Sequence, residues 1–306
     1  MSDSDTPDPP RGRPLEIELE PEPTVVGRLA RWIERGRILR SSVETARADH
    51  ASVDLGFTLI ERDSAIGGGL LAGALAYRLF VLLLPTALLF VSGLGLYADA
   101  ANESPGKVAE QAGLHGLIAS QVASTASSNA RWIVFVLMVP AVLYALAKLY
   151  RAIAIVYALV WHGSGRGTRT SPKGVGILGV ALLVDLGAAE VVGWIRRHDQ
   201  LGGTSALAVY LVVVGGAWLV ASMHLPHRDV RWPALVPGAL LVGAGLLFVN
   251  VFNVYVTTRL VDERADTYGA LGIAAALLFS LVLVGRLMLM SAELNAALYE
   301  RRARTH

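Results

Sequence analysis

Six long runs of apolar residues divide the chain, and each is long enough to cross a lipid bilayer as a helix. A hydrocarbon core about 30 Å thick needs about 20 apolar residues in an α-helix. The predicted spans are 67–96, 132–160, 174–195, 206–225, 234–256 and 268–298. Three of these runs hold about 30 residues, so they should tilt, kink or project beyond the lipid, and Pro85, Pro140 and Pro237 are candidate kink sites. The pattern predicts an all-α polytopic membrane protein with six transmembrane helices.

Two polar segments of different character precede the first apolar run. Residues 1–23 carry six prolines and seven acidic residues. This composition predicts a disordered tail, because it buries too little apolar surface to offset the entropy lost on ordering. Residues 24–60 are basic, and apolar side chains recur at helical spacing between arginines from Val25 to Val43. We expect an amphipathic cytoplasmic helix there, which either packs on the protein's own cytoplasmic face or lies on anionic lipid headgroups that contact residues 24–45.

Lysine and arginine are unevenly divided between the two sides of the predicted bundle. Seventeen of them fall in polar segments on the side of the two termini, and six fall in segments on the other side. Because basic loops are retained in the cytoplasm, both termini should be cytoplasmic. The six-helix domain should cover residues 61–300, and residues 301–306 should form a short basic cytoplasmic tail.

The composition supports a membrane protein and excludes several classes of function. Apolar residues make up 54% of the chain and charged residues 17%, whereas soluble domains carry about 25% charged residues. The chain has no cysteine, which excludes disulfides, iron–sulfur clusters and thiol catalysis. A net charge of +2 is too small to indicate nucleic-acid binding. No cofactor-binding motif is present, and His224 and His227 lack a third strong ligand for a metal, so we expect neither a cofactor nor a metal.

Several ionisable and amide side chains lie inside the predicted spans, where they are costly unless they are paired or reach water. Arg78 and Asp185 each lie 11 residues into a span that begins on the cytoplasmic side, so we expect them to share a depth and form an ion pair. Arg286 and Glu293 are seven residues apart, on nearly one face of the last span. The full set of candidates for a polar cavity or for interhelical clamps is Arg78, Asp185, Asn250, Asn253, Arg286 and Glu293.

Two regions carry motifs that can be compared with known families. The first span contains AGALAYRLFVLLLPTALLF (residues 72–90), with Tyr77 and Pro85. The C-terminal half has a W-x-x-x-x-P-G-A segment, a Y-G-x-L-G start to the last span and an A-E-L-N-A segment near its end. The motif positions there are Pro237, Gly238, Tyr268, Gly269, Glu293 and Asn295. Over about residues 55–300 the chain resembles the YihY/virulence factor BrkB family, which implies a bacterial inner-membrane protein with six helices and no settled activity, although some members have carried a ribonuclease name.

The leading functional hypothesis is a transporter or exporter of a small or lipid-like solute. The predicted spans hold four cationic and three anionic side chains, which favours an anionic solute. Two alternatives stay open, namely a non-catalytic membrane scaffold or envelope-integrity factor and an intramembrane enzyme. The sequence has no compact cluster of carboxylates or histidines for metal-assisted hydrolysis, so we expect no enzymatic activity. Since no nucleotide-binding motif is present, any pumping would use an ion gradient or a partner protein.

Overall fold

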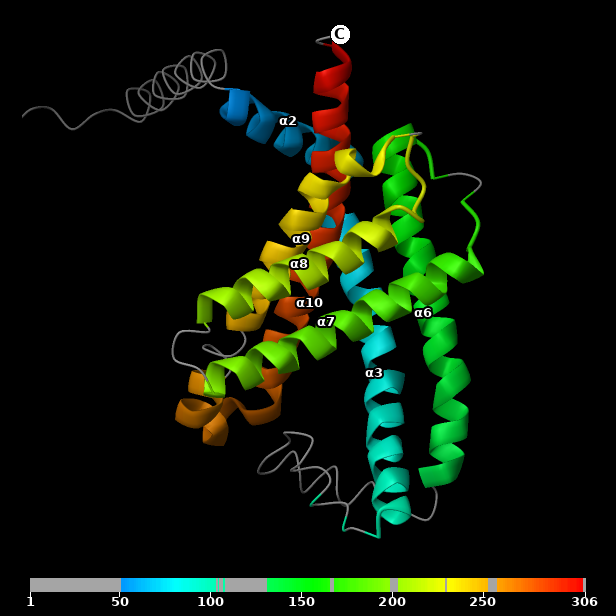
Figure 1. Cartoon of the computed structure of the whole chain (residues 1–306), viewed down its shortest axis with the longest axis vertical. Helices are drawn as coiled ribbons and strands as arrows, with labels where there is room; N and C mark the ends of the chain where they lie inside the picture. Colours follow the sequence, from blue (N-terminus) through cyan, green and yellow to red (C-terminus); the bar gives the residue numbers. More distant parts are fainter. Residues whose placement is uncertain are drawn as a thin grey trace, which may run out of the picture. The chain divides into compact units, whose positions relative to one another are not determined.

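The structure of the protein, a computed structural model, describes residues 51–102, 104, 107, 131–165, 168–198, 203–228, 230–252 and 258–304. Every regular element within these residues is a helix (Figure 1). The helices are α2 (Ala51–Ile66), α3 (Gly68–Ala100), α6 (Arg131–His162), α7 (Pro172–His198), α8 (Gly203–Ser222), η1 (Trp232–Ala234), α9 (Val236–Phe252) and α10 (Thr258–Arg304). From Leu55 onward they belong to one compact unit, Leu55–His306. The predicted all-α class is therefore confirmed for the described residues.

Three helices are both long enough and apolar enough to cross a membrane, namely Gly68–Ala100, Trp132–His162 and Ala275–Ala303. Two shorter apolar helices are Ala206–Ser222 and Val236–Phe252. Lipid offers no partner to a backbone N–H or C=O group, so a spanning segment satisfies these groups within its own helix. Each of the six predicted apolar runs coincides with a helix, and the count of six membrane spans stays a prediction. The predicted tail and most of the amphipathic segment lie outside the described residues.

Large apolar side chains cover the outer faces of α3 and α6. Leu84 and Phe90 on α3, and Trp132 and Leu143 on α6, each expose more than half of their surface. A water-soluble protein rarely exposes a continuous apolar area of this extent, whereas lipid tails accommodate it. These faces therefore fit contact with the hydrocarbon core of a membrane.

Helix α10 is the element that joins the others. It packs against α3, α6 and α9, while α3 packs against α6 and α8 packs against both α7 and α9. Figure 1 shows α3 beside α6 and α7 beside α8. The packed faces meet in an apolar core whose most buried members include Leu75 of α3, Ile153 of α6 and Leu289 of α10. The polar side chains of α10 are thus held within a tightly packed frame.

A glycine allows α10 to approach the backbone of α3. A Cβ atom on Gly285 would lie 2.7 Å from the carbonyl oxygen of Ala72 and 3.2 Å from the Cβ atom of Leu75. A backbone carbonyl cannot move aside as a side chain can, so this crossing requires glycine. Gly69 and Gly73, which are four apart on α3, have no neighbouring atom within 4 Å of an added Cβ. The close contact on α3 therefore involves Ala72 and not this glycine pair.

Replacing Gly285 by alanine should destabilise the protein in spite of the better helix propensity of alanine. Overpacking costs about 1–3 kcal/mol, and the gain in propensity is at most about 1 kcal/mol. Thermal unfolding of the purified protein in detergent measures the difference. Gly73→Ala is the matched control and should leave the midpoint unchanged or raise it, because its Cβ meets open space. Equal midpoints for the two variants would show that the crossing does not depend on Gly285.

Candidate functional site

Helix α10 carries three ionisable side chains at intervals of seven residues, Arg286, Glu293 and Glu300. Seven residues make nearly two helical turns, so these side chains lie along one face, each about 10 Å from the next. We call this row the α10 stripe. Arg62 and Asp63 of α2 pair with its two ends. Two residues that precede the first predicted span therefore neutralise charges on α10.

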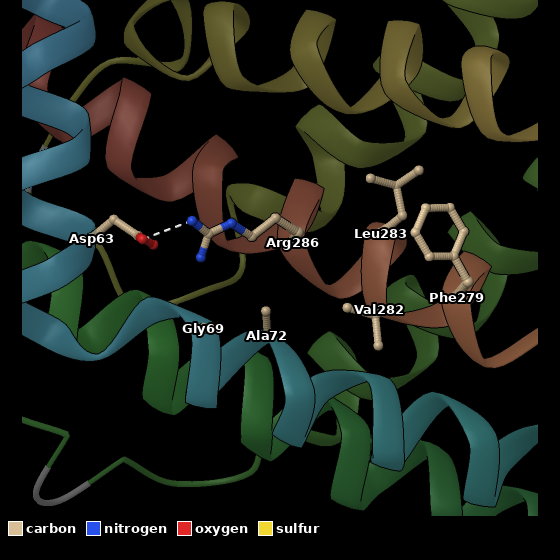
Figure 2. Close-up of a pocket in the computed structure, with 7 residues that line it drawn as sticks. All are labelled: Asp63, Gly69, Ala72, Phe279, Val282, Leu283 and Arg286. Carbon is tan, nitrogen blue, oxygen red and sulfur yellow. Dashed lines mark hydrogen bonds and ion pairs between the residues drawn. The ribbon is translucent and has the colours of Figure 1, made fainter. Parts of the chain in front are cut away.

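Arg286 forms an ion pair with Asp63 at the first end of the α10 stripe. Its Nη2 atom donates a hydrogen bond to Asp63 Oδ2 at 2.6 Å, and Figure 2 shows the two side chains reaching toward each other from α10 and α2. The side chains are 35% and 18% exposed. A guanidinium carries five N–H donors, and Asp63 is its one hydrogen-bond partner among the described residues. The other N–H donors of Arg286 have no hydrogen-bond partner among the residues that the structure describes.

The junction between α2 and α3 determines where Asp63 lies. Gly67 has a φ of +67°, in the left-handed region that glycine adopts without strain. A Cβ atom on Gly68 would overlap the carboxylate of Asp63. These two glycines turn the chain from α2 into α3 and leave room for the Asp63 side chain beside Arg286.

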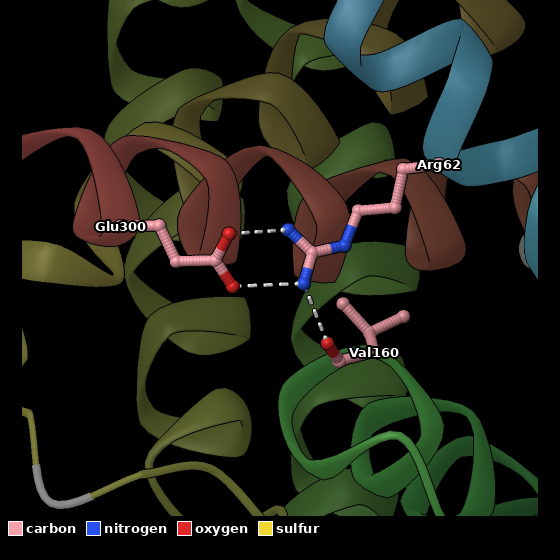
Figure 3. Close-up of polar contacts among 3 residues, drawn as sticks. All are labelled: Arg62, Val160 and Glu300. Atoms are coloured by element: carbon pink, nitrogen blue, oxygen red, sulfur yellow. Dashed lines mark hydrogen bonds and ion pairs between the residues drawn. The ribbon is translucent and has the colours of Figure 1, made fainter.

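Arg62 and Glu300 form a two-pronged ion pair at the other end of the α10 stripe (Figure 3). Nη1 of Arg62 donates to Glu300 Oε2 at 3.3 Å, and Nη2 donates to Oε1 at 3.0 Å. Nη2 also donates to the backbone oxygen of Val160 at 2.9 Å. Paired parallel bonds fix the orientation of a guanidinium. Because Val160 belongs to α6, Arg62 joins α2 to both α6 and α10.

Glu293 occupies the middle of the α10 stripe and has no ion pair with any described residue. It is 1% exposed, and its Oε1 atom is buried without a hydrogen-bond partner in the part of the chain that the structure describes. The charged side chains that act on it are Asp63, Arg286 and Arg62. Both arginines already bind other carboxylates. Glu293 is therefore a buried carboxyl group next to two arginines that are paired elsewhere.

A cavity of about 380 Å³ lies beside the ion pair of Arg286 and Asp63. Phe279, Val282 and Leu283 of α10 form its apolar wall, and Figure 2 shows them on the turns of the helix that precede Arg286. Helix α3 lines the same cavity with small residues. The cavity is therefore charged at one end and apolar along the rest of its length.

Asn295 of α10 holds the start of α9. Its Oδ1 atom accepts a hydrogen bond from the backbone N–H of Gly238 at 2.7 Å, and its Nδ2 atom donates to the carbonyl oxygen of Leu235 at 3.2 Å. A Cβ atom on Gly238 would lie 2.5 Å from Nδ2, so glycine makes room for the amide. We call this contact the α9 clamp. Pro237 is the second residue of α9, where a missing N–H costs nothing, so it starts a helix and does not kink one.

A buried polar network, which the sequence did not reveal, links α6, α8 and α10. The Tyr157 hydroxyl lies 3.2 Å from Ser222 Oγ and 3.3 Å from Ser291 Oγ. Trp218 Nε1 donates to Ser291 Oγ at 3.1 Å. All four side chains are buried, so they form a closed set of interhelical bonds, here called the Tyr157 network. Single serines and aromatic residues in apolar runs carry no sequence signal for such a network.

Arg78 and Asp185, both within the described residues, do not form the ion pair that their shared depth predicted. Asp185 Oδ1 accepts a hydrogen bond from the Tyr210 hydroxyl of α8 at 2.7 Å. The guanidinium carbon of Arg78 lies 5.9 Å from the centre of the Tyr77 ring on its own helix. Equal depth does not determine how each helix is rotated about its axis, and α7 turns Asp185 toward its neighbour α8. The two residues are therefore in different environments.

The remaining predicted sites are the two asparagines and the segment that was expected to bind lipid. Asn250 of α9 lies near the Tyr210 hydroxyl, so it places a further polar group beside the contact between α7 and α8. Asn253 and residues 24–45 lie outside the described residues. The side chains that the structure describes include no group of three or more histidine, aspartate or glutamate residues able to hold a metal ion.

Comparison with known proteins places these features in a family. The sequence model of the family described as Virulence factor BrkB matches residues 60–306. The chain belongs to this family. The resemblance drawn from the motifs is confirmed, and the matched region begins within α2, so it includes Arg62 and Asp63 as well as the α10 stripe. No curated protein and no solved structure matches the chain.

The motif positions of this BrkB-family chain have different structural settings. Gly238 and Asn295 form the α9 clamp, so the P-G-A and A-E-L-N-A segments are in contact in this chain. Pro85 lies inside α3 and Tyr77 is exposed on the same helix. Tyr268 and Gly269 lie within the helical backbone of α10. Glu293 is the motif residue that occupies the candidate site.

The variants Asp63→Asn and Arg286→Gln should affect stability non-additively. Each single change leaves one charge of a half-buried pair uncompensated, whereas the double change removes both charges, so we expect a coupling free energy of about 1–3 kcal/mol. Chemical unfolding of the four proteins in detergent gives this value. The control cycle combines Asp63→Asn with Arg78→Gln, which are not in contact and should add within about 0.5 kcal/mol. Additivity in the first cycle would show that the ion pair contributes nothing to stability.

Proposed function

We propose that the protein is a transporter or exporter in the bacterial inner membrane that moves a small or lipid-like anionic solute and catalyses no reaction. The observation that carries this proposal is the cavity beside Arg286, which combines a cationic group with an apolar wall between two span-length helices. Membership of the BrkB family and the apolar helices support the membrane setting. The proposal includes six spans with both termini in the cytoplasm.

The chemistry of the cavity favours an anionic amphiphile. A guanidinium binds a carboxylate or phosphate through parallel N–H bonds, and Asp63 engages one nitrogen of Arg286. Phe279, Val282 and Leu283 offer apolar surface next to this cation. The volume of about 380 Å³ lies within the range of small-molecule sites, about 300–1,000 Å³. An amphiphile could place its anionic head at Arg286 and its apolar tail against the apolar wall of α10.

In this proposal Asp63 takes the place of the solute when the site is empty. Arg286 on a membrane helix is costly without a counter-charge, and Asp63 supplies one at 2.6 Å. An anionic solute that binds Arg286 competes with Asp63 for the same guanidinium. When the solute leaves, Asp63 pairs with Arg286 again, so the arginine has a partner throughout the cycle.

A non-catalytic membrane scaffold is the second candidate function. The Tyr157 network favours it, because its side chains bond to one another in a buried setting and hold three helices together. Such a network stabilises a bundle without providing a path for a solute. The two candidates differ in whether a change at Arg286 affects movement of a solute or stability alone.

Replacing Arg286 by glutamine should slow the transfer of an anionic amphiphile across the membrane. The protein is reconstituted in liposomes with fluorescent lysophosphatidylglycerol in the outer leaflet, and dithionite then measures how much probe has become protected. Loss of a hydrogen bond to a charged group costs about 1.5–3 kcal/mol, so the rate should fall by about tenfold or more. Lysophosphatidylcholine, whose head carries no net charge, should be transferred more slowly by the native protein.

Two controls make this transfer experiment specific to the cavity. Arg286→Lys keeps a cation and should retain part of the rate, and Arg78→Gln removes an arginine that does not line the cavity and should retain all of it. Transfer by the native protein no faster than by empty liposomes would reject transport of this class of solute and favour the scaffold.

The topology can be tested directly because the chain has no cysteine. Single cysteines at Ser2, Ser104 and His306 are exposed to a membrane-impermeant thiol reagent in intact cells. Six spans with both termini inside predict that only the cysteine at position 104 reacts. Reaction at either terminus would show that the orientation or the number of spans is wrong.

A further inference from the structure

Among the residues that the structure describes, Glu293 is the one charged group of the α10 stripe that has no ion pair. Its two neighbours on the stripe are each engaged, Arg286 by Asp63 and Glu300 by Arg62. Glu293 is also the most buried member, at 1% exposure, and its Oε1 atom has no partner among the described residues. A carboxylate in such a place is costly because neither water nor a bonded cation compensates its charge.

The charges that face Glu293 come from α2 and α10. Arg62 and Asp63 approach it from α2, and Arg286 acts on it from its own helix. Glu300 follows on the α10 stripe and neutralises Arg62. Counted over these five groups, the cluster is neutral if Glu293 carries a proton and has one negative charge if it does not. Protonation of Glu293 therefore brings the net charge of the cluster to zero.

We propose that Glu293 is a proton-binding site that couples solute movement to the proton gradient. The site takes a proton from water on one side of the membrane to form a neutral carboxylic acid, and it releases that proton to water on the other side. The coupling step rests on the proposed transport function, whereas the protonation of Glu293 does not.

Electrostatic linkage supplies the coupling between proton and solute. Binding of a monoanion at Arg286 adds a negative charge to a cluster that already carries one when Glu293 is ionised. The same anion binds to a neutral cluster when Glu293 is protonated. The proton and the anion therefore promote each other's binding, and by reciprocity each raises the affinity for the other by the same factor. The two ligands would move in the same direction.

A proton fits this position better than a metal cation does. Arg62 and Arg286 would repel a cation at Glu293, and the side chains that the structure describes include no group of three carboxylate or histidine ligands. A proton needs one oxygen only, and Oε1 is available. Asp63 is the nearest rival carboxyl group, since its Oδ1 atom is also buried without a described partner, but its other oxygen binds Arg286.

Infrared difference spectroscopy of the full-length protein in lipid nanodiscs tests the protonation directly. Between pH 6 and pH 9, the native protein should lose the carbonyl stretching band of a protonated carboxylic acid. Glu293→Gln should lack this change, and Asp99→Asn, which removes an exposed carboxylate near the end of α3 and outside this cluster, should retain it. The same band change in Glu293→Gln and in the native protein would overturn the proposal. Loss of the change in Asp63→Asn but not in Glu293→Gln would overturn it as well, because the proton would then belong to Asp63.

The stability of Glu293→Gln provides an independent check. Glutamine has the shape of the protonated acid, so the variant should fold and unfold at a midpoint near that of the native protein at pH 6. A variant that fails to fold would overturn the proposal, because it would show that the site needs the carboxylate. A native band that responds to replacement of Na⁺ by choline at constant pH would also overturn it in favour of a cation site.

Proton uptake on addition of lysophosphatidylglycerol separates this inference from the proposed function. With a pH-sensitive dye in weakly buffered solution, the native protein should take up protons when the probe binds, and Glu293→Gln should not. A titrating band in the absence of probe binding would uphold the protonation of Glu293 and reject transport of this solute class. Transfer of the probe without a titrating band would uphold transport of this solute class and reject the protonation of Glu293.

Discussion

The cost of placing charge on a membrane helix is the constraint on which the rest of the structure depends. Helix α10 carries Arg286, Glu293 and Glu300 on one face within its apolar length, and lipid compensates none of them. Two of the three are neutralised by adjacent residues of α2, Arg62 and Asp63. These two ion pairs hold α2 against α10. Gly67 and Gly68 allow the turn from α2 into α3 that this position requires.

Two kinds of polar contact coexist in the bundle and have different consequences. The Tyr157 network and the α9 clamp are buried, with their hydrogen bonds made inside the protein. They resemble the interhelical bonds by which membrane helices associate. The pair of Arg286 and Asp63 is partly exposed and lies at the edge of a cavity. The first kind can only hold helices together, whereas the second can exchange its partner for an anion.

The sequence identified the elements well and their partners poorly. Apolar runs at helical length located α3 and α6 to α10, because length and hydropathy are properties of a single segment. The seven-residue spacing of Arg286 and Glu293 also placed both on one face of α10. Arg62 and Asp63 were missed because they precede the apolar run and read as ordinary polar residues. The pairing of Arg78 with Asp185 was wrong because depth constrains one coordinate, and contact also needs the rotation and the neighbours of each helix.

The sequence motifs also do not reveal which of their residues are in contact with one another. Asn295 and Gly238 were recognised as parts of two separate motifs, 57 residues apart in the chain. Neither motif by itself predicts the hydrogen bond between Gly238 and Asn295. That bond forms only because the start of α9 lies beside α10 in the folded protein. The same reasoning applies to Gly285, whose role depends on the carbonyl of Ala72 in a different helix.

The close crossing at Gly285 also limits how the cavity can change its contents. Gly285 directly precedes Arg286, and the backbone of α3 lies within 2.7 Å of the place where its Cβ would be. Moving α10 away from α3 at this point would break the packed core around Leu75 and Leu289. The carboxylate of Asp63, by contrast, is held through one hydrogen bond and belongs to a helix that precedes the glycine junction. In the proposed mechanism, exchange at Arg286 therefore displaces the α2 carboxylate and leaves the contact between α3 and α10 intact.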